Sequence, residues 1–121
     1  MTTLWIAVAG SAGAMTRFVL DGVIRQHRNS RFPWATFVIN VTGSLVLGFV
    51  TGLMVFHGAA RDLGLILGVG FCGGYTTFST AGIETVRLIQ SRYYTTAAAN
   101  AVGSLVVTVA AGGIGLALAA L

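Results

Sequence analysis

Charge is scarce in this sequence of 121 residues: charged side chains make up 8% of it, against about 25% in a typical soluble domain. Hydrophobic residues make up 55% and gather in four apolar stretches. Each stretch has at least ~20 residues, enough to cross ~30 Å of hydrocarbon as a helix. The stretches cover roughly residues 3–24, 34–56, 62–90 and 95–120. This pattern excludes a soluble domain and predicts an all-α membrane protein with one four-helix transmembrane domain.

Cysteine and histidine are also rare. Cys72 is the single cysteine, which excludes an internal disulfide. The two histidines, His27 and His57, fall in or beside the connections between stretches. No histidine–cysteine cluster therefore has metal-ligand spacing, and no Ser-His-acid set converges, so we expect that the protein is not an enzyme. No basic residue precedes the first apolar stretch, which we interpret as a retained helix and not as a cleaved signal peptide.

Lysine is absent, and all seven basic residues are arginines. The net charge of +4 and the pI near 10.3 suggest nucleic-acid binding at first sight. Arginines scattered between membrane spans are, however, typical of orientation signals, so we expect no nucleic-acid partner. The second connection holds only Arg61, beside Asp62. The first and third connections hold Arg25, Arg28, Arg31 and Arg92. The positive-inside rule therefore predicts that these two connections are cytoplasmic and both termini are outside.

The short connections predict an up-down-up-down arrangement of the spans. Glycine occurs 17 times, and several pairs have the G-x-x-x-G spacing that lets helices approach closely. These pairs are Gly48–Gly52, Gly64–Gly68 and Gly70–Gly74. Four thin helices have little interior of their own. We therefore expect most of these small-residue faces to meet another subunit in an obligate oligomer.

A few ionisable side chains fall inside the predicted spans, where charge is costly. Arg17 and Asp21 are one helical turn apart and are expected to pair, although Arg before Asp is the weaker order. A place at a pore vestibule is the alternative for Arg17. Glu84 precedes Arg87 by three residues, and we expect the two to form an exposed pair near the end of the third span.

Polar side chains in the second and fourth spans leave alternatives open. Asn40 is the one amide of the second span, and it is either a hydrogen-bonding link between helices or a contact for an ion or substrate. Asn100 in the fourth span has the same two interpretations. Ser104 and Thr108 lie one turn apart on one helix face. Taken alone, their hydroxyls are most often bonded back to their own helix.

The third span contains an unusual run, G-G-Y-T-T-F-S-T at residues 73–80. As a continuous helix this span would be about 43 Å long at ~1.5 Å per residue, which exceeds the ~30 Å hydrocarbon core. Gly73 and Gly74 weaken a helix, and the four hydroxyl residues can bond freed backbone groups. Either the helix is broken at an ion or substrate site, or it is merely kinked. The ring edge of Phe78, within this run, carries the positive part of the aromatic quadrupole and suits an anion.

Over essentially its full length the chain resembles the Fluc (CrcB) fluoride channels. The segments that carry the resemblance are G-S-A-G-A-M-T-R-F at 10–18, W-A-T-F-V-I-N-V-T-G-S at 34–44, G-F-C-G-G-Y-T-T-F-S-T-A-G-I-E at 70–84 and G-S-L-V-V-T at 103–108. The resemblance implies antiparallel dimers with two narrow pores and a broken third helix. It also implies passive, selective export of fluoride across the prokaryotic plasma or inner membrane, which relieves fluoride toxicity.

The resemblance carries site residues over by position. The implied pore lining combines uncharged donors with one phenylalanine: Asn40, Phe78, Ser79, Thr80, Ser104 and Thr108. The backbone carbonyls of Gly73 and Thr76 would surround a structural sodium ion between the two subunits. Arg17 and Glu84 match family positions with either a vestibule role or a structural role.

One position departs from the family pattern. The family usually has T-T-F-S-T-F, whereas this chain has Ala81 in place of the second pore phenylalanine. The chain therefore works either as an antiparallel homodimer or with an oppositely oriented paralogue that supplies the missing ring. In the second case it is expected to be a weakly conducting or non-conducting subunit of the pair. A small multidrug transporter is the rival from another class. It needs a carboxylate deep in a span, and Asp21 and Glu84 both lie towards span ends.

Overall fold

The computed structural model covers residues 1–121 and describes all of them except Asn29. The described residues form helices, turns and short extended connections, with no strand among them. The first two crossings are each one helix, and the third and fourth are built from several segments. The segments in chain order are α1 (Thr2–His27), α2 (Trp34–His57), α3 (Arg61–Gly64), the π-helical η1 (Leu65–Cys72), α4 (Gly73–Tyr75), α5 (Phe78–Gln90), α6 (Tyr94–Ala98), the π-helical η2 (Ala99–Gly103) and α7 (Ser104–Ala120).

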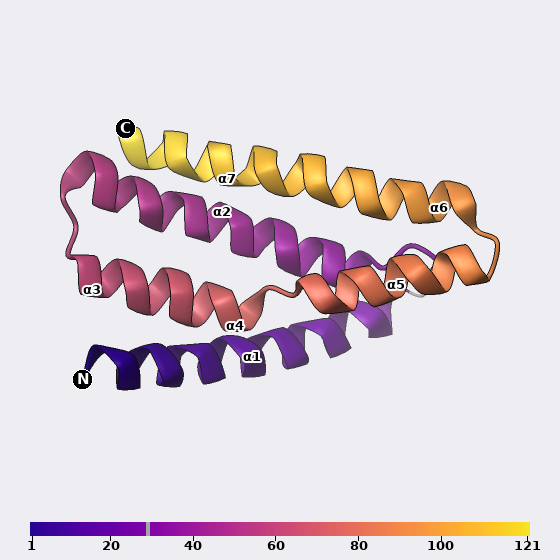
Figure 1. Ribbon diagram of the computed structural model, residues 1–121, viewed down its shortest axis with the longest axis horizontal. Coiled ribbons are helices and arrows are strands. Elements are labelled where there is room, and N and C mark those ends of the chain that lie inside the picture. Colours follow the sequence, from indigo (N-terminus) through magenta and orange to yellow (C-terminus); the bar gives the residue numbers. More distant parts are fainter. Residues whose placement is uncertain (29) are drawn as a thin grey trace.

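All four crossings are long and apolar enough to span a bilayer. Their lengths lie between 24 and 30 residues and their mean hydropathies between 1.2 and 2.0. Both termini lie at one end of the molecule, together with the connection between α2 and α3 (Figure 1). The first and third connections lie at the opposite end. The chain is therefore an all-helical, multi-pass membrane protein.

Local signals set the helix ends. Pro33 immediately precedes α2, as suits a residue that cannot donate a backbone hydrogen bond. Gly58 ends α2 in the left-handed region with φ 64°, a conformation that glycine adopts without a steric penalty. After α5 the chain turns at Arg92, which has φ 65° and bonds its amide to the carbonyl of Ile89 at 3.0 Å. These ends produce the short connections that force neighbouring crossings to run in opposite directions.

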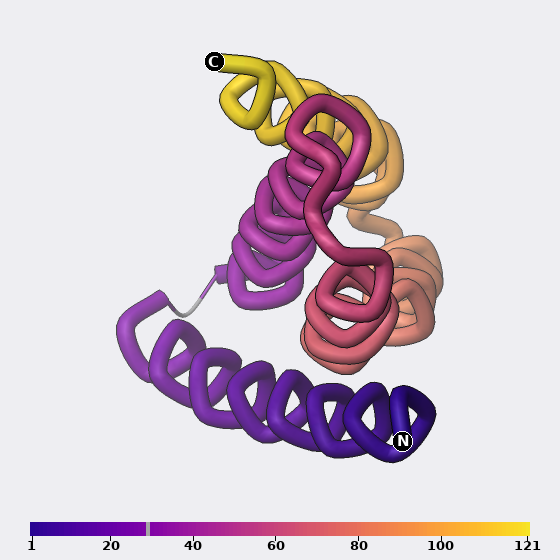
Figure 2. Tube along the Cα trace, turned by 90° about the vertical axis from the view of Figure 1, so that its left-hand side faces the viewer, coloured from indigo at the N-terminus to yellow at the C-terminus, as the bar shows by residue number. Residues whose placement is uncertain are grey.

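The crossings follow one another in the order α7, α2, third crossing, α1 (Figure 1). Seen along the bundle, α1 lies across the third crossing on the side away from α7 (Figure 2). Glycines allow the contact between α2 and α7 at two places: a Cβ on Gly48 would collide with the backbone of Gly112, and one on Gly115 would collide with the backbone of Leu45. The contact between α2 and α7 is therefore made backbone against backbone.

The same holds where α1 meets the third crossing. A Cβ on Gly74 would collide with the carbonyl of Gly10, and one on Gly13 would collide with that of Phe71. The expectation that most small-residue faces meet another subunit is therefore wrong for these positions, because the chain uses them to pack its own helices. The faces that remain exposed are rich in large apolar side chains such as Phe18, Phe78 and Val109.

Candidate functional site at the interruption of the third crossing

The third crossing is interrupted at two residues. Thr76 (φ −79°, ψ 160°) and Thr77 (φ −146°, ψ 120°) are extended between α4 and α5. The amide of Thr76 closes the last turn of α4 on the carbonyl of Cys72 at 2.9 Å. The hydroxyl of Thr77 then caps α5 by accepting from the amide of Thr80 at 3.2 Å. The interruption is thus a defined stop and restart, with a side-chain cap at the restart.

The two glycines of the run do not make the interruption. Gly73 is helical, with φ −61° and ψ −39°, and α4 continues through Gly74. Gly74 instead packs against Gly10, whose carbonyl a Cβ at position 74 would hit. The sequence signal for the restart is Thr77, because threonine directly before a helix is a favoured cap. Thr77 was counted among the hydroxyl residues of the run, but this capping role was not predicted.

Asn40 on α2 holds the interruption in place. Its Oδ1 accepts from the amide of Thr77 at 2.8 Å, and its Nδ2 donates to the carbonyl of the same residue at 2.8 Å. One carboxamide thus satisfies both backbone groups of a residue outside any helix, at a depth where water is scarce. Of the two interpretations open for Asn40, the link between helices is what this geometry displays. One Nδ2 hydrogen is left over, because a carboxamide has two.

This arrangement strips two carbonyls of their helical donors. In a continuous helix the carbonyl of Gly73 would accept from the amide of Thr77, and that of Thr76 from the amide of Thr80. Both amides donate to side-chain oxygens instead, of Asn40 and of Thr77. Gly73 and Thr76 are the same two residues whose carbonyls the resemblance assigns to a sodium ion. Freed carbonyl oxygens of an interrupted helix suit a hard cation.

A cavity of about 490 Å³ lies between α2, the interruption, α5 and the fourth crossing. Four of the six predicted pore residues line it: Asn40, Phe78, Ser104 and Thr108. The ring of Phe78 is 92% exposed, so this chain leaves it free for contacts beyond itself. Ser79 and Thr80 are not among the lining residues; Ser79 is exposed and Thr80 is half-buried. Ala81 also lines the cavity, at the position where the resemblance leads us to expect a phenylalanine.

Asn100 fastens α5 to the fourth crossing. Its Nδ2 donates to Thr85 Oγ1 at 2.7 Å and to the carbonyl of Ala81 at 3.4 Å. Its Oδ1 accepts from Ser104 Oγ at 3.3 Å. Asn100 is 1% exposed, so it is one of the most deeply buried side chains of this chain. The geometry assigns it to linking helices, and it adds Thr85, which the sequence analysis did not single out.

Two hydroxyls of the predicted pore, those of Ser104 and Thr108, line the cavity and donate to protein acceptors. Thr108 Oγ1 donates to the carbonyl of Ser104 at 2.6 Å, which is the back-bonded arrangement expected of isolated hydroxyls. Ser104 instead donates to the side chain of Asn100. A hydroxyl carries one hydrogen that rotates about the C–O bond. These residues can therefore present a donor to an anion only by giving up an existing hydrogen bond.

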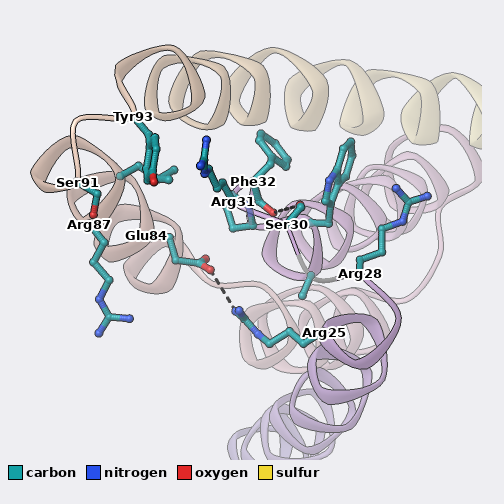
Figure 3. A pocket seen from close by; sticks show the side chains of 13 residues that line it. Arg25, Arg28, Ser30, Arg31, Phe32, Glu84, Arg87, Ser91 and Tyr93 are labelled. Carbon is teal, nitrogen blue, oxygen red and sulfur yellow. Dashed lines mark hydrogen bonds and ion pairs between the residues drawn. The ribbon is translucent and has the colours of Figure 1, made fainter.

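The ion pairs differ from both predicted ones. Arg25, and not Arg17, binds Asp21, with Nε 2.9 Å from Oδ1. The Nη2 of the same arginine lies 3.1 Å from Oε2 of Glu84, so Glu84 pairs with α1 and not with Arg87 (Figure 3). The Glu84 side chain is 13% exposed and the Arg25 side chain is 49% exposed, so the carboxylate is largely covered while the arginine stays half-exposed. The Asp-before-Arg order is the stronger helical spacing, and the long reach of Arg25 supplies the contact across helices.

Asn100→Leu is expected to destabilise the protein. The change removes two hydrogen bonds between α5 and the fourth crossing and one within the fourth crossing, each worth ~0.6 kcal/mol on average in membrane proteins. The thermal midpoint in detergent, followed by fluorescence-detected size exclusion, should fall by roughly 5–10 °C. Thr51→Val is the control, because its hydroxyl bonds only to its own helix at Leu47. Equal midpoints for both variants would contradict the linking role of Asn100.

Comparison with known proteins places this geometry in context. A family model described as CrcB-like protein, Camphor Resistance (CrcB), matches residues 4–116. The chain is 50% identical over 116 residues to fluoride-specific ion channel FluC 1 of Leifsonia xyli, covering 96% of this chain and 85% of that protein. It is 44% identical over 119 residues to fluoride-specific ion channel FluC 2 of Cutibacterium acnes, covering 98% and 97% of the two chains. It is 40% identical over 118 residues to FluC of Novosphingobium aromaticivorans, covering 96% and 94%.

Proposed function

Because the chain belongs to the CrcB family, we propose that it is a fluoride-selective channel. It lets cytoplasmic fluoride leave the cell passively and so reduces fluoride toxicity. The relatives named as fluoride-specific ion channels support this proposal, and their similarity extends over almost the whole chain. Passive permeation requires no covalent step, so the protein is not an enzyme. Its place is the prokaryotic plasma or inner membrane.

The observation that carries the proposal is the chemistry of the cavity. Every described residue that lines it is uncharged, and several bear N–H or O–H groups, including Asn40, Ser104 and Thr108. Fluoride is small and strongly hydrated, so its entry requires donors that replace water. Conduction also requires that the ion leave again, and a fixed guanidinium or ammonium group would hold it too tightly. Neutral donors meet both requirements: Asn40 has one Nδ2 hydrogen left over, and Ser104 and Thr108 can exchange an existing hydrogen bond for one to the anion.

We propose that the other assigned residues act at the same pore. Phe78 offers a ring edge to the anion. Ser79, Thr80 and Thr108 form a polar track, with Ser104 beside it. The exposure of Phe78 and Ser79 supports a pore wall that is completed by a second subunit.

The second subunit, in this proposal, is an antiparallel copy of the chain, and a sodium ion lies between the two copies. The freed carbonyls of Gly73 and Thr76 would hold this ion, because their helical donors have turned to side chains. When bound, the ion supplies a fixed positive charge that lowers the barrier for an anion nearby. The chain contributes the carbonyls, and Asn40 keeps the interruption open around them.

A second candidate rests on Ala81. Its methyl group lines the cavity where the family has a phenylalanine, so a homodimer lacks that ring in both pores. In this alternative the chain pairs with an oppositely oriented paralogue that supplies the ring, and it is itself weakly conducting or non-conducting. Reconstitution of the lone chain decides between the two candidates, since robust flux would reject the need for a partner.

Fluoride efflux from proteoliposomes that contain the purified chain tests the proposal. We expect fluoride efflux without chloride efflux, and a fall in fluoride efflux of up to about tenfold in Phe78→Ile, because isoleucine has no ring edge to offer the anion and ~1.4 kcal/mol corresponds to tenfold. Phe56→Ile is the matched control, since Phe56 is an exposed phenylalanine at the far end of α2. Equal fluoride and chloride efflux would reject a fluoride-selective channel. Unchanged flux in Phe78→Ile would reject only the assignment of Phe78 to the pore.

A further inference from the structure

A second cavity, of about 450 Å³, lies at the end of the bundle that carries the first and third connections. Four arginines line it: Arg25 from α1, Arg28 and Arg31 from the first connection, and Arg87 from α5 (Figure 3). Because these connections join membrane crossings, the cavity lies at the level of the membrane surface. It is separate from the cavity at the interruption, with which it shares no lining residue.

Charge in this second cavity is unbalanced. Glu84 is the one acidic residue among the described lining residues, and it binds Arg25. Asp21 binds the same arginine. Two carboxylates thus gather on one guanidinium. Within the described part of the chain, no carboxylate lies within ion-pair distance of Arg28, Arg31 or Arg87. These three positive charges call for an anion from outside the chain.

Two of the three guanidiniums are held against aromatic rings. Arg28 lies over the ring of Trp34, 5.4 Å from its centroid, and Arg31 lies over Tyr93 at 4.1 Å. Stacking engages the face of a guanidinium and leaves its N–H groups, which lie in the plane, free to donate. Trp and Tyr are the residues that settle at headgroup level in membrane proteins. Orientation signalling alone requires positive charge, but it does not require guanidiniums fixed on aromatic platforms.

We propose that this second cavity binds the phosphate of an anionic phospholipid headgroup. Guanidinium N–H groups suit phosphate oxygens, since they can donate two parallel hydrogen bonds to one phosphate. Basic pockets between transmembrane helices that open to a lipid surface are sites of this chemistry. The headgroup supplies the negative charge that is missing beside Arg28 and Arg31. It also bridges the first connection to the turn before α6. This site is independent of the route proposed for fluoride.

The test measures lipid retention on the purified full chain by native mass spectrometry. Phosphatidylglycerol is the probe and phosphatidylcholine the neutral control, with wild type, the double variant Arg28→Gln/Arg31→Gln, and Arg61→Gln from the opposite end of the bundle. Wild type and Arg61→Gln should retain phosphatidylglycerol in preference to phosphatidylcholine. The double variant should lose apparent affinity for phosphatidylglycerol by about 10- to 30-fold. Each arginine near an anionic headgroup strengthens binding by about fivefold, and the variant removes two of them.

Two further arms keep the result interpretable. Fluoride efflux from liposomes made only of phosphatidylcholine should be the same for the double variant and wild type, which shows that the variant folds. A titration with inorganic phosphate separates the two sources of the anion. Displacement of phosphatidylglycerol by millimolar phosphate would assign the cavity to free phosphate and overturn the lipid assignment. Unchanged phosphatidylglycerol retention in a folded double variant would overturn the site itself.

Discussion

Asn40→Asp is expected to lower fluoride efflux about 100-fold. The substitution removes the Nδ2 donor and places a carboxylate oxygen against the carbonyl of Thr77, which then has no partner. An unsatisfied buried group costs ~1–3 kcal/mol, and about 3 kcal/mol corresponds to roughly 100-fold. The added negative charge also repels an anion in the adjacent cavity. The measurement is initial fluoride efflux from proteoliposomes at matched protein content.

Thr16→Val serves as the matched control for Asn40→Asp. It removes a polar group whose single bond, to the carbonyl of Ala12 at 2.8 Å, stays within its own helix. We expect wild-type efflux from this variant. If Asn40→Asp conducted fluoride as well as the control does, conduction would depend neither on the hydrogen bonds between Asn40 and Thr77 nor on the position of Asn40 at the cavity.

Gly74→Ala should lower the thermal midpoint by roughly 10–15 °C and reduce the fraction of protein that elutes as a single species. A Cβ at this position would overlap the carbonyl of Gly10, and because the obstacle is backbone, α1 and α4 must move apart. Overpacking of this kind costs ~1–3 kcal/mol or more. Thermal unfolding in detergent, followed by size exclusion, measures the effect.

The matched control for Gly74→Ala is Gly22→Ala on α1, where a Cβ would meet no atom within 4 Å. This variant should be as stable as wild type or slightly more stable, because alanine is favoured over glycine inside a helix by up to ~1 kcal/mol. Similar loss of stability in both variants would contradict a tight contact between Gly10 and Gly74.

The features that could be predicted from the sequence are those written in contiguous residues. Apolar stretches of sufficient length predict the four crossings, and four short segments in order identify the family. The crowding of hydroxyl residues at 73–80 indicates the site. Its exact register was not predictable in this way, because Thr77 is held extended by Asn40, which lies 37 residues away. Local propensity favoured the glycines, and a distant side chain set the position instead.

The sequence also could not tell which residues pair with one another across helices. Arg17 and Glu84 each have an oppositely charged residue at helical spacing, so a local rule suggests pairs within one helix. The observed ion pair of Glu84 reaches Arg25 across 59 positions. The glycine pairs show the same limit: their spacing predicts close approach, but it does not tell whether the approaching helix belongs to the same chain. In each case the missing information is tertiary proximity.

The two parts of the third crossing, before and after the interruption, are held by contacts with different helices. Before the interruption, η1 and α4 rest on α1, backbone against backbone. After it, α5 is tied to the fourth crossing by Asn100 and to α1 by the side chain of Arg25. The part before the interruption is held firmly against α1. This packing fixes the position of the carbonyls of Gly73 and Thr76, which have lost their helical donors. The later part is held by different contacts, so residues 78–90, several of which line the cavity at the interruption, can change without disturbing the backbone contact of η1 and α4 with α1.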